Sequence, residues 1–137
     1  MTTFVDTSAW YAAADSSDAS NTRAQRWLSS GEPLLTTDHV LAETWLLLRH
    51  RLGRPAAEQF WTGLRSSGVT LECVTAADLE SAYATGQMFA DQDWSVVDRT
   101  SFAAMERLRL ERVATLDSDF AVYRYGPRRQ RAFTMLE

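Results

Sequence analysis

Short apolar segments rich in β-branched residues alternate along this chain with segments of helical character, and this alternation constrains the fold more than any other feature. The expected strands cover residues 3–5, 34–36, 69–74, 112–116 and 131–136. The expected helices cover residues 8–14, 18–28, 37–52, 56–64, 75–90 and 95–110, and a helical turn is expected at 117–123. Strands separated by helices favour parallel pairing, so we expect an α/β fold with a central, mostly parallel sheet.

The length and composition indicate one domain, spanning residues 1–137. The chain has 137 residues, of which 45% are hydrophobic, and this is enough to bury a core. We find no internal repeat and no linker. No apolar run approaches the roughly 20 residues that cross a bilayer, and no basic segment followed by an apolar one suggests a secretory signal. The single cysteine, Cys73, lies in a strand-like run, so we expect a small core residue in a reducing cytoplasm.

Two carboxylates come directly after expected strands. Asp6 follows the first strand, and Asp117 follows the strand at 112–116. In open parallel α/β sheets, binding sites form beyond the carboxyl ends of the strands. A short carboxylate at such a place also accepts backbone N–H bonds as a helix cap. For each acid taken alone, both interpretations stay open.

Two further acids lie within expected helices. Glu43 shares a helix face with Val40, Leu46 and Leu47, and a lone glutamate among core residues has to be paired, protonated or bound to a metal. The alternative is that it lies at the edge of the apolar stripe and reaches water. Asp98 has the spacing of a capping box with Ser95 and also borders an apolar face.

These four acids can converge on one edge of the sheet, although their spacing does not prove it. A cluster of carboxylates repels itself unless it is protonated or neutralised. Oxygen ligands select hard cations, Mg²⁺ or Mn²⁺. The formal net charge of −4 argues against an ordinary basic nucleic-acid binder, but acids drawn into a metal site lower this charge without repelling phosphate once the metal is bound.

Four segments together resemble the PIN domain, in particular the VapC-type toxins of bacterial toxin–antitoxin pairs. They are FVDTSA at 4–9, VLAET at 40–44, VDRTSFA at 97–103 and TLDSDF at 115–120. Tyr125-Gly126 before the last expected strand is also similar to one branch of the family. Each motif is weak alone, but their order along the whole chain is fairly specific.

The resemblance implies a three-layer α/β/α fold and a Mg²⁺- or Mn²⁺-dependent endoribonuclease. It implies that the metal and its waters are held by the four principal acids, Asp6, Glu43, Asp98 and Asp117. The positions that match polar neighbours of the family's site are Ser8, Thr7 and Thr115; Asp119 is a spare acid or a capping partner of Asp117. The implied partners are an RNA substrate, a cognate antitoxin whose segment lies in a groove near the active site, and a second copy of the chain in a homodimer.

Arginines are the expected contacts to the RNA backbone, because all 14 basic residues are arginine and the planar guanidinium suits phosphate. The chosen positions are Arg49 and Arg51 at the end of one helix, and Arg128 and Arg129 near the C-terminus. A solvated basic surface explains any one of them equally well.

Two other interpretations of the chain compete with a nuclease. Phosphatases and receiver domains also place an aspartate at a strand end, but they use a lysine near the phosphoryl group, and this chain has none. A non-catalytic PIN-like interaction module, whose acids mainly cap helices, remains the alternative.

Overall fold

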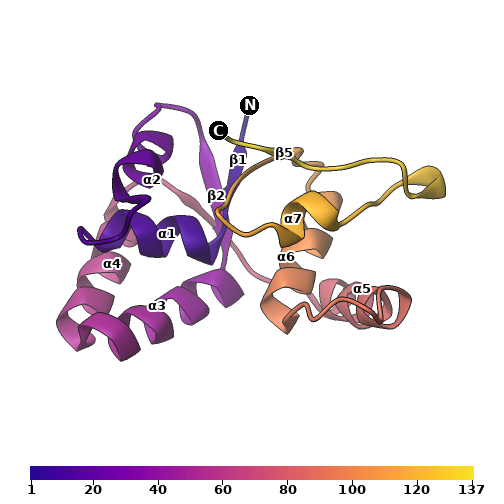
Figure 1. Cartoon of the computed structure of the whole chain (residues 1–137), viewed down its shortest axis with the longest axis horizontal. Coiled ribbons are helices and arrows are strands. Elements are labelled where there is room, and N and C mark those ends of the chain that lie inside the picture. Colours follow the sequence, from indigo (N-terminus) through magenta and orange to yellow (C-terminus); the bar gives the residue numbers. More distant parts are fainter.

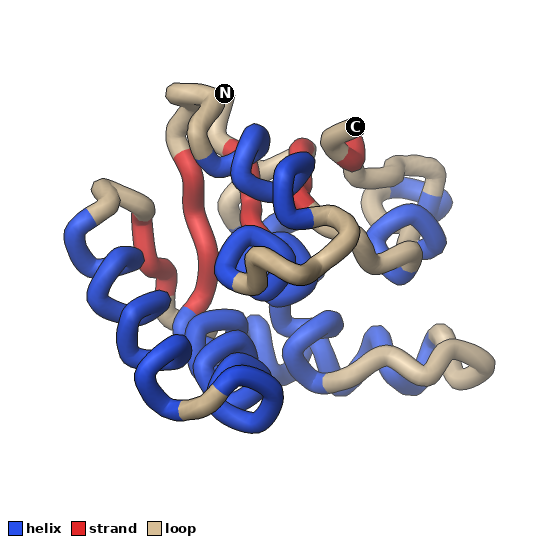
Figure 2. The backbone as a smooth tube through the Cα atoms, turned by 60° about the vertical axis from the view of Figure 1, so that its left-hand side comes forward, coloured by secondary structure: helices blue, strands red, loops and turns tan.

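A five-stranded parallel sheet forms the centre of the computed structural model, which describes residues 1–137. Its strands are β1 (Thr3–Val5), β2 (Leu34–Thr37), β3 (Thr70–Glu72), β4 (Arg112–Ala114) and β5 (Thr134–Met135). They lie in the order β3-β2-β1-β4-β5, and every pair is parallel. Figure 2 shows the strands side by side among the helices. The expected mostly parallel sheet is confirmed.

Seven helices cover the sheet. They are α1 (Thr7–Ala14), α2 (Asn21–Leu28), α3 (Asp38–Leu52), α4 (Arg54–Ser66), α5 (Ala76–Met88), α6 (Val96–Arg107) and α7 (Asp119–Val122). Figure 1 shows α1 to α4 on one side of the strands and α5 to α7 on the other, which is the expected three-layer α/β/α arrangement. None of these helices combines the length and apolar character that crossing a membrane requires.

The strand order places a topological switch point between β1 and β4. From β1 the chain moves outward through β2 to β3, and it then returns across the sheet to β4 on the other side of β1. Because the direction reverses there, the helices on either side of this point belong to opposite layers, and binding sites of open α/β sheets form beyond the carboxyl ends of the strands at such a point. Asp6 follows β1 directly, and Thr115 follows β4 directly.

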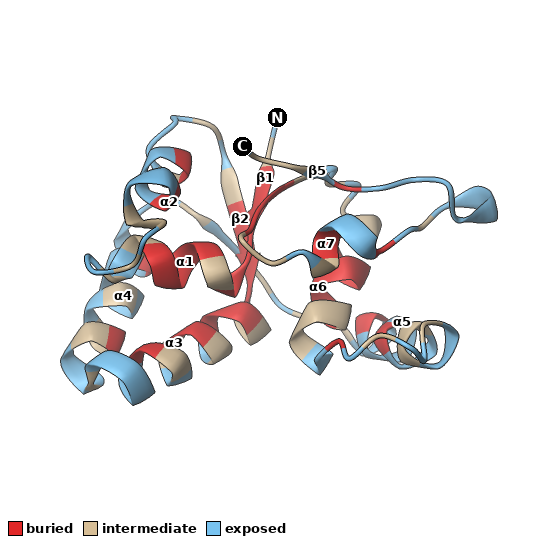
Figure 3. Ribbon diagram, viewed as in Figure 1, coloured by how far each residue is buried: buried red, intermediate tan, exposed pale blue.

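Apolar side chains of β1 and β4 are buried between the layers, as Figure 3 shows for the strands. Phe4, Val5 and Val113 are completely buried, as expected for central parallel strands covered on both faces. On the α6 side, Phe102 packs edge-on against Phe120 of α7, with 5.0 Å between ring centroids. This contact fixes the start of α7 against α6, and both helices carry acids of the site.

One sequence prediction about a buried residue is wrong, and Glu43 follows the second of the two alternatives that the sequence left open. Cys73 is exposed, not part of the core, because it follows β3, which is an edge strand with no neighbour on its outer side. Leu46 is 58% exposed, so the face of α3 that contains Glu43 is only partly apolar. Glu43 itself is half-buried and therefore lies at the edge of the stripe.

An ion pair between a half-exposed arginine and a buried aspartate joins α5 to α6. Asp78 is 2% exposed and completes a capping box with Thr75. Arg107 donates two hydrogen bonds to its carboxylate, from Nε at 3.0 Å and from Nη2 at 2.9 Å, and a third to Glu72. Burial alone would raise the pKa of Asp78, but the hydrogen bonds from Arg107 and from the Thr75 backbone lower it below its usual value.

Replacing Arg107 with alanine should lower the free energy of unfolding by about 3 kcal/mol at pH 7, because it leaves a buried carboxylate without its partner. Urea denaturation measures this loss. The hydrogen bonds from Arg107 help to keep the pKa of Asp78 below 3.8 in wild type, whereas burial without Arg107 raises the pKa of Asp78 in the variant. The difference from wild type should therefore already shrink as the pH falls toward 3.8, and it should go on shrinking below that pH. Arg65→Ala, at an exposed arginine of α4, is the control, and an equal loss in both variants would contradict the role of the pair.

Candidate active site

Three carboxylates meet at the switch point of the sheet. Asp98 lies in the first turn of α6, Asp117 follows β4, and Asp119 begins α7. One carboxylate oxygen from each can be chosen so that all three oxygens lie within 4.8 Å of one another. All three residues are half-buried. Two of the four acids that the sequence singled out, Asp98 and Asp117, therefore lie together, and Asp119 joins them.

Asp6 lies beside this cluster at the end of β1. Its side chain is 3% exposed and forms no capping hydrogen bond to α1, so helix capping does not account for it. Thr115 donates a hydrogen bond to Oδ2 of Asp6 at 2.9 Å, and Ser8 donates one to the same oxygen at 3.2 Å. These hydroxyl groups link the ends of β1 and β4 and hold the carboxylate in place.

The same hydroxyl groups also order the loop after β4. The backbone N–H of Leu116 donates to Ser8 Oγ at 2.8 Å, and the N–H of Asp117 donates to Thr115 Oγ1 at 3.0 Å. The expected supporting positions of Ser8 and Thr115 are thus in contact with the principal acids. Thr7 differs, because its Oγ1 is buried and has no hydrogen-bond partner.

The carboxylates of the site raise one another's pKa values. Burial raises the pKa of Asp6 to about 7, with smaller contributions from the charges of Asp98 and Asp117. Burial and the charges of Asp117 and Asp98 raise the pKa of Asp119 to about 6. The pKa of Asp98 is also raised, by burial and by the charges of Asp117 and Glu43. Glu43 therefore borders the cluster from α3 and adds to its charge.

The oxygens of the cluster suit a hard cation. Asp98 accepts the Ser95 N–H through Oδ2, which completes the expected capping box, and Asp117 accepts the Asp119 N–H through Oδ1. The second oxygen of each carboxylate accepts no hydrogen bond from outside the cluster. Oxygen donors that repel one another and lack other partners fit a divalent cation, which would relieve that repulsion. Capping occupies one oxygen of each of these two acids, so the other oxygen stays available to a metal.

Asp119 is the residue whose position the sequence indicates least well. The sequence leaves it as a spare acid or a capping partner, yet it belongs to the group of three converging carboxylates. Two features of the sequence could have indicated that Asp119 belongs to the site. Asp119 lies two residues after Asp117, and the next residue, Phe120, is completely buried and anchors α7. Conversely, Asp6 and Glu43 flank that group of three.

The four expected arginines lie away from the cluster. Arg49 and Arg51 are exposed in the last turn of α3, with their guanidinium groups over the rings of Trp45 and Tyr11. Arg128 and Arg129 are exposed in the loop before β5.

The fold places an acidic site at the switch point between β1 and β4. Such a site suits a reaction assisted by a divalent cation. The model of the PIN domain family matches residues 3–124, so this chain belongs to the PIN domain family. The "23S rRNA-specific endonuclease VapC20" of Mycobacterium tuberculosis is 38% identical over 119 residues, which cover 86% of this chain and 91% of that protein. The expected identification as a VapC-type PIN domain is confirmed.

Solved structures agree with this assignment. The crystal structure of Mycobacterium tuberculosis VapC20, described as a "Sarcin-Ricin loop cleaving toxin", has a TM-score of 0.82 at 36% identity, and the match covers 88% of this chain and 93% of that one. VapBC2 from Rickettsia felis, bound to a DNA fragment from its promoter, has a TM-score of 0.69 at 11% identity over the whole of both chains. The second likeness is one of fold alone.

Proposed function

We propose that this chain is a VapC-type toxin that cleaves RNA as a Mg²⁺- or Mn²⁺-dependent endoribonuclease. The observation that carries the proposal is the convergence of Asp98, Asp117 and Asp119 at the switch point, in a chain 38% identical to a 23S rRNA-specific endonuclease. The alternative, an interaction module whose acids only cap helices, accounts less well for Asp6, which is buried, carries a raised pKa and caps nothing.

The residues of the site have separate roles in this proposal. Asp98, Asp117 and Asp119 would hold the cation through carboxylate oxygens, and Asp6 and Glu43 would add to the negative charge around it. A bound divalent cation would supply a Lewis acid for a phosphate oxygen and lower the pKa of an attacking water. Ser8 and Thr115 fix the carboxylate of Asp6, so that little reorganisation is needed when the substrate arrives.

The substrate class follows from the relatives. Because VapC20 is named for 23S rRNA and for the sarcin–ricin loop, we infer that the substrate of this chain is a structured ribosomal RNA. Arg49 and Arg51 stay predicted RNA contacts, and their stacking over aromatic rings still leaves N–H groups for phosphate.

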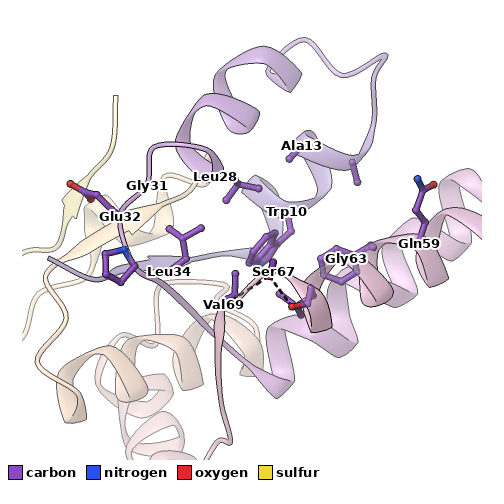
Figure 4. A pocket seen from close by; sticks show the side chains of 15 residues that line it. Trp10, Ala13, Leu28, Gly31, Glu32, Leu34, Gln59, Gly63, Ser67 and Val69 are labelled. Carbon is purple, nitrogen blue, oxygen red and sulfur yellow. Dashed lines mark hydrogen bonds between the residues drawn. The ribbon is translucent and has the colours of Figure 1, made fainter.

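An antitoxin is the inferred protein partner, and an apolar pocket supports this inference. A cavity of about 520 Å³ lies between α1, α2 and α4, beside the residues that precede β2 and β3. Figure 4 shows Trp10, Leu28, Leu34 and Val69 around it. The pocket lies near the amino ends of the strands, and the acids lie at their carboxyl ends. An antitoxin segment that fills the pocket and also covers the acids therefore has to run along the layer formed by α1 to α4.

A homodimer is the remaining part of the proposal. Leu79 and Tyr83 lie one turn apart on α5 and are 44% and 67% exposed. An exposed apolar pair on one helix face supports burial against a second copy of the chain.

The test is cleavage of a synthetic stem–loop with the sequence of the 23S rRNA sarcin–ricin loop. We expect a specific cut in the presence of Mg²⁺ or Mn²⁺, no cut with EDTA, and recovery when excess Mg²⁺ is added back. The same stem closed by a scrambled loop is the matched control and should stay intact. If neither this RNA nor total cellular RNA is cut with either cation, the nuclease proposal fails and the interaction module becomes the better account.

A further inference from the structure

A basic loop projects from the body of the protein between α7 and β5, as Figure 1 shows. We call residues 124–131 the arginine loop. It contains four arginines, Arg124, Arg128, Arg129 and Arg131, and no acid. All four are exposed (Figure 3), and the ion pairs of the chain are made by Arg54, Arg107 and Arg112 instead. The loop therefore carries positive charge that no ion pair neutralises, in a chain whose net charge is −4.

The arginine loop is held in one shape. Tyr125 and Arg131 exchange both backbone hydrogen bonds, each of 3.0 Å, and so close the loop as an antiparallel bridge. The Tyr125 ring stacks on the buried ring of Phe133, with 4.8 Å between centroids. Inside the loop, the Arg129 N–H donates to the Gly126 carbonyl at 3.0 Å. Binding to such a loop loses little conformational entropy, because the loop is already ordered.

Two arginines of the loop adopt a backbone conformation that glycine adopts more readily. The φ angles of Arg128 and Arg129 are 56° and 49°, in the left-handed region. Arg129 has contacts within the protein, since its Nη1 donates to the Arg124 carbonyl and its guanidinium lies over the Phe89 ring. Arg128 makes no side-chain hydrogen bond or ion pair. The guanidinium of Arg128 is therefore free to bind a partner outside the protein.

The position of the loop favours RNA over an acidic protein segment as that partner. Arg128 lies nine positions after Asp119, and part of this stretch is helix α7, so the loop lies at most roughly 25 Å from the acid cluster. An RNA bound at the acids can reach it with a few more nucleotides. The apolar pocket between α1, α2 and α4 is in the opposite layer of the fold, on the other side of the sheet. Planar guanidinium groups also match phosphate oxygens in pairs.

We propose that the arginine loop is a second RNA-contact surface, which binds backbone phosphates of a folded RNA outside the cleaved segment, with Arg128 as its freest contact. The proposal rests on the proposed ribonuclease function. It implies that the enzyme selects structured RNA partly through this remote contact, while the acids perform the cleavage. Phosphate contacts of this kind position the substrate and carry no base information.

The test compares two charge reversals with the same change in net charge, Arg128→Glu in the loop and Arg65→Glu at an exposed position of α4. Binding of a fluorescein-labelled sarcin–ricin stem–loop is measured by anisotropy in EDTA, where no cleavage is expected, at several KCl concentrations. Arg128→Glu should raise Kd about tenfold and reduce the slope of log Kd against log salt by about one. Arg65→Glu makes the same change in net charge at an exposed position outside the loop, so it should change Kd by less than about twofold.

A third variant, Arg128→Gly, separates loss of contact from loss of folding. Glycine suits the left-handed backbone, so the Tm should stay the same or rise by a few degrees while RNA binding weakens. In Mg²⁺, both Arg128 variants should raise KM for the stem–loop and leave kcat within about twofold of wild type.

The proposal is overturned if Arg128→Glu binds the stem–loop as tightly as Arg65→Glu does. It is also overturned if Arg128→Glu weakens binding of a cognate antitoxin segment but not of RNA. These outcomes differ from failure of the nuclease function, which appears as absence of cleavage by the wild-type protein in Mg²⁺.

Discussion

Replacing Asp98 with asparagine should lower kcat/KM for cleavage of the sarcin–ricin stem–loop at least about a hundredfold, without unfolding the protein. The amide oxygen of the new side chain can still accept the Ser95 N–H, so the capping box and the start of α6 remain. The variant loses the negative charge of one of the three converging carboxylates. A divalent cation would then be held by two of the three converging carboxylates and bind far more weakly.

The matched control is Asp93→Asn. Asp93 lies five residues earlier, outside the cluster, and accepts no hydrogen bond, so this variant should cleave RNA within about twofold of wild type. Thermal unfolding monitored by circular dichroism checks that both variants fold. If Asp98→Asn cleaves as fast as Asp93→Asn, the acid cluster is not the catalytic site.

Replacing Asp6 with asparagine should have opposite effects on stability and on activity. The folded protein raises the pKa of Asp6 from 3.8 to about 7, so the unfolded chain gives up this proton more readily than the folded one does. Ionisation therefore costs stability, and this cost grows as the pH rises from about 4 to 7. At pH 8 without metal it amounts to about 2–4 kcal/mol. The asparagine side chain carries no charge, and it keeps an oxygen that can accept from Thr115 and Ser8.

Urea denaturation in EDTA measures this effect. At pH 8, Asp6→Asn should be more stable than wild type by about 2–4 kcal/mol, and the gain should shrink toward zero as the pH approaches 4. RNA cleavage by the same variant should fall at least about a hundredfold. A variant that is less stable than wild type at pH 8, or whose difference from wild type is the same at pH 8 and pH 4, would show that no strained buried charge is present at Asp6.

Added Mg²⁺ should stabilise the wild-type protein, because a cation bound only by the folded state shifts unfolding by mass action, by about 2.7 kcal/mol at a hundred times its Kd. In Asp6→Asn the same addition should give a smaller gain, since part of the repulsion is already removed. A smaller Mg²⁺-induced gain in Asp6→Asn than in wild type would show that the cation offsets the repulsion between the acids.

Features governed by local sequence could be predicted well. The capping box at Ser95–Asp98 follows from side chains three residues apart and forms as expected, and Thr75 and Asp78 form a second box with the same spacing. The order of strands and helices also follows from local pattern, because each short apolar run lies between clear helix signals. The start of helix α2 is an exception. This helix begins at Asn21 instead of near Asp18, because the Asp18 carboxylate accepts the N–H of Ser20 in a turn before the helix.

Features that depend on distant packing could not be predicted. Asp119 joins the cluster because Phe120 packs on Phe102 of another helix. The hydrogen bond from Thr115 to Asp6 spans 109 positions of sequence, so neither residue indicates it alone. The exposure of Cys73 depends on β3 being the edge strand, and this is decided by the strand order, not by the composition of the strand.

The central claim is that the carboxylates at the switch point hold a divalent cation, and anomalous diffraction from crystals grown with Mn²⁺ tests it most directly. A strong anomalous peak is expected between the free oxygens of Asp98, Asp117 and Asp119, at a distance of about 2.2 Å from each ligand oxygen. The peak should be absent in crystals of Asp98→Asn grown in the same solution. A wild-type crystal with no peak at these acids, or with Mn²⁺ bound only elsewhere, would contradict the account.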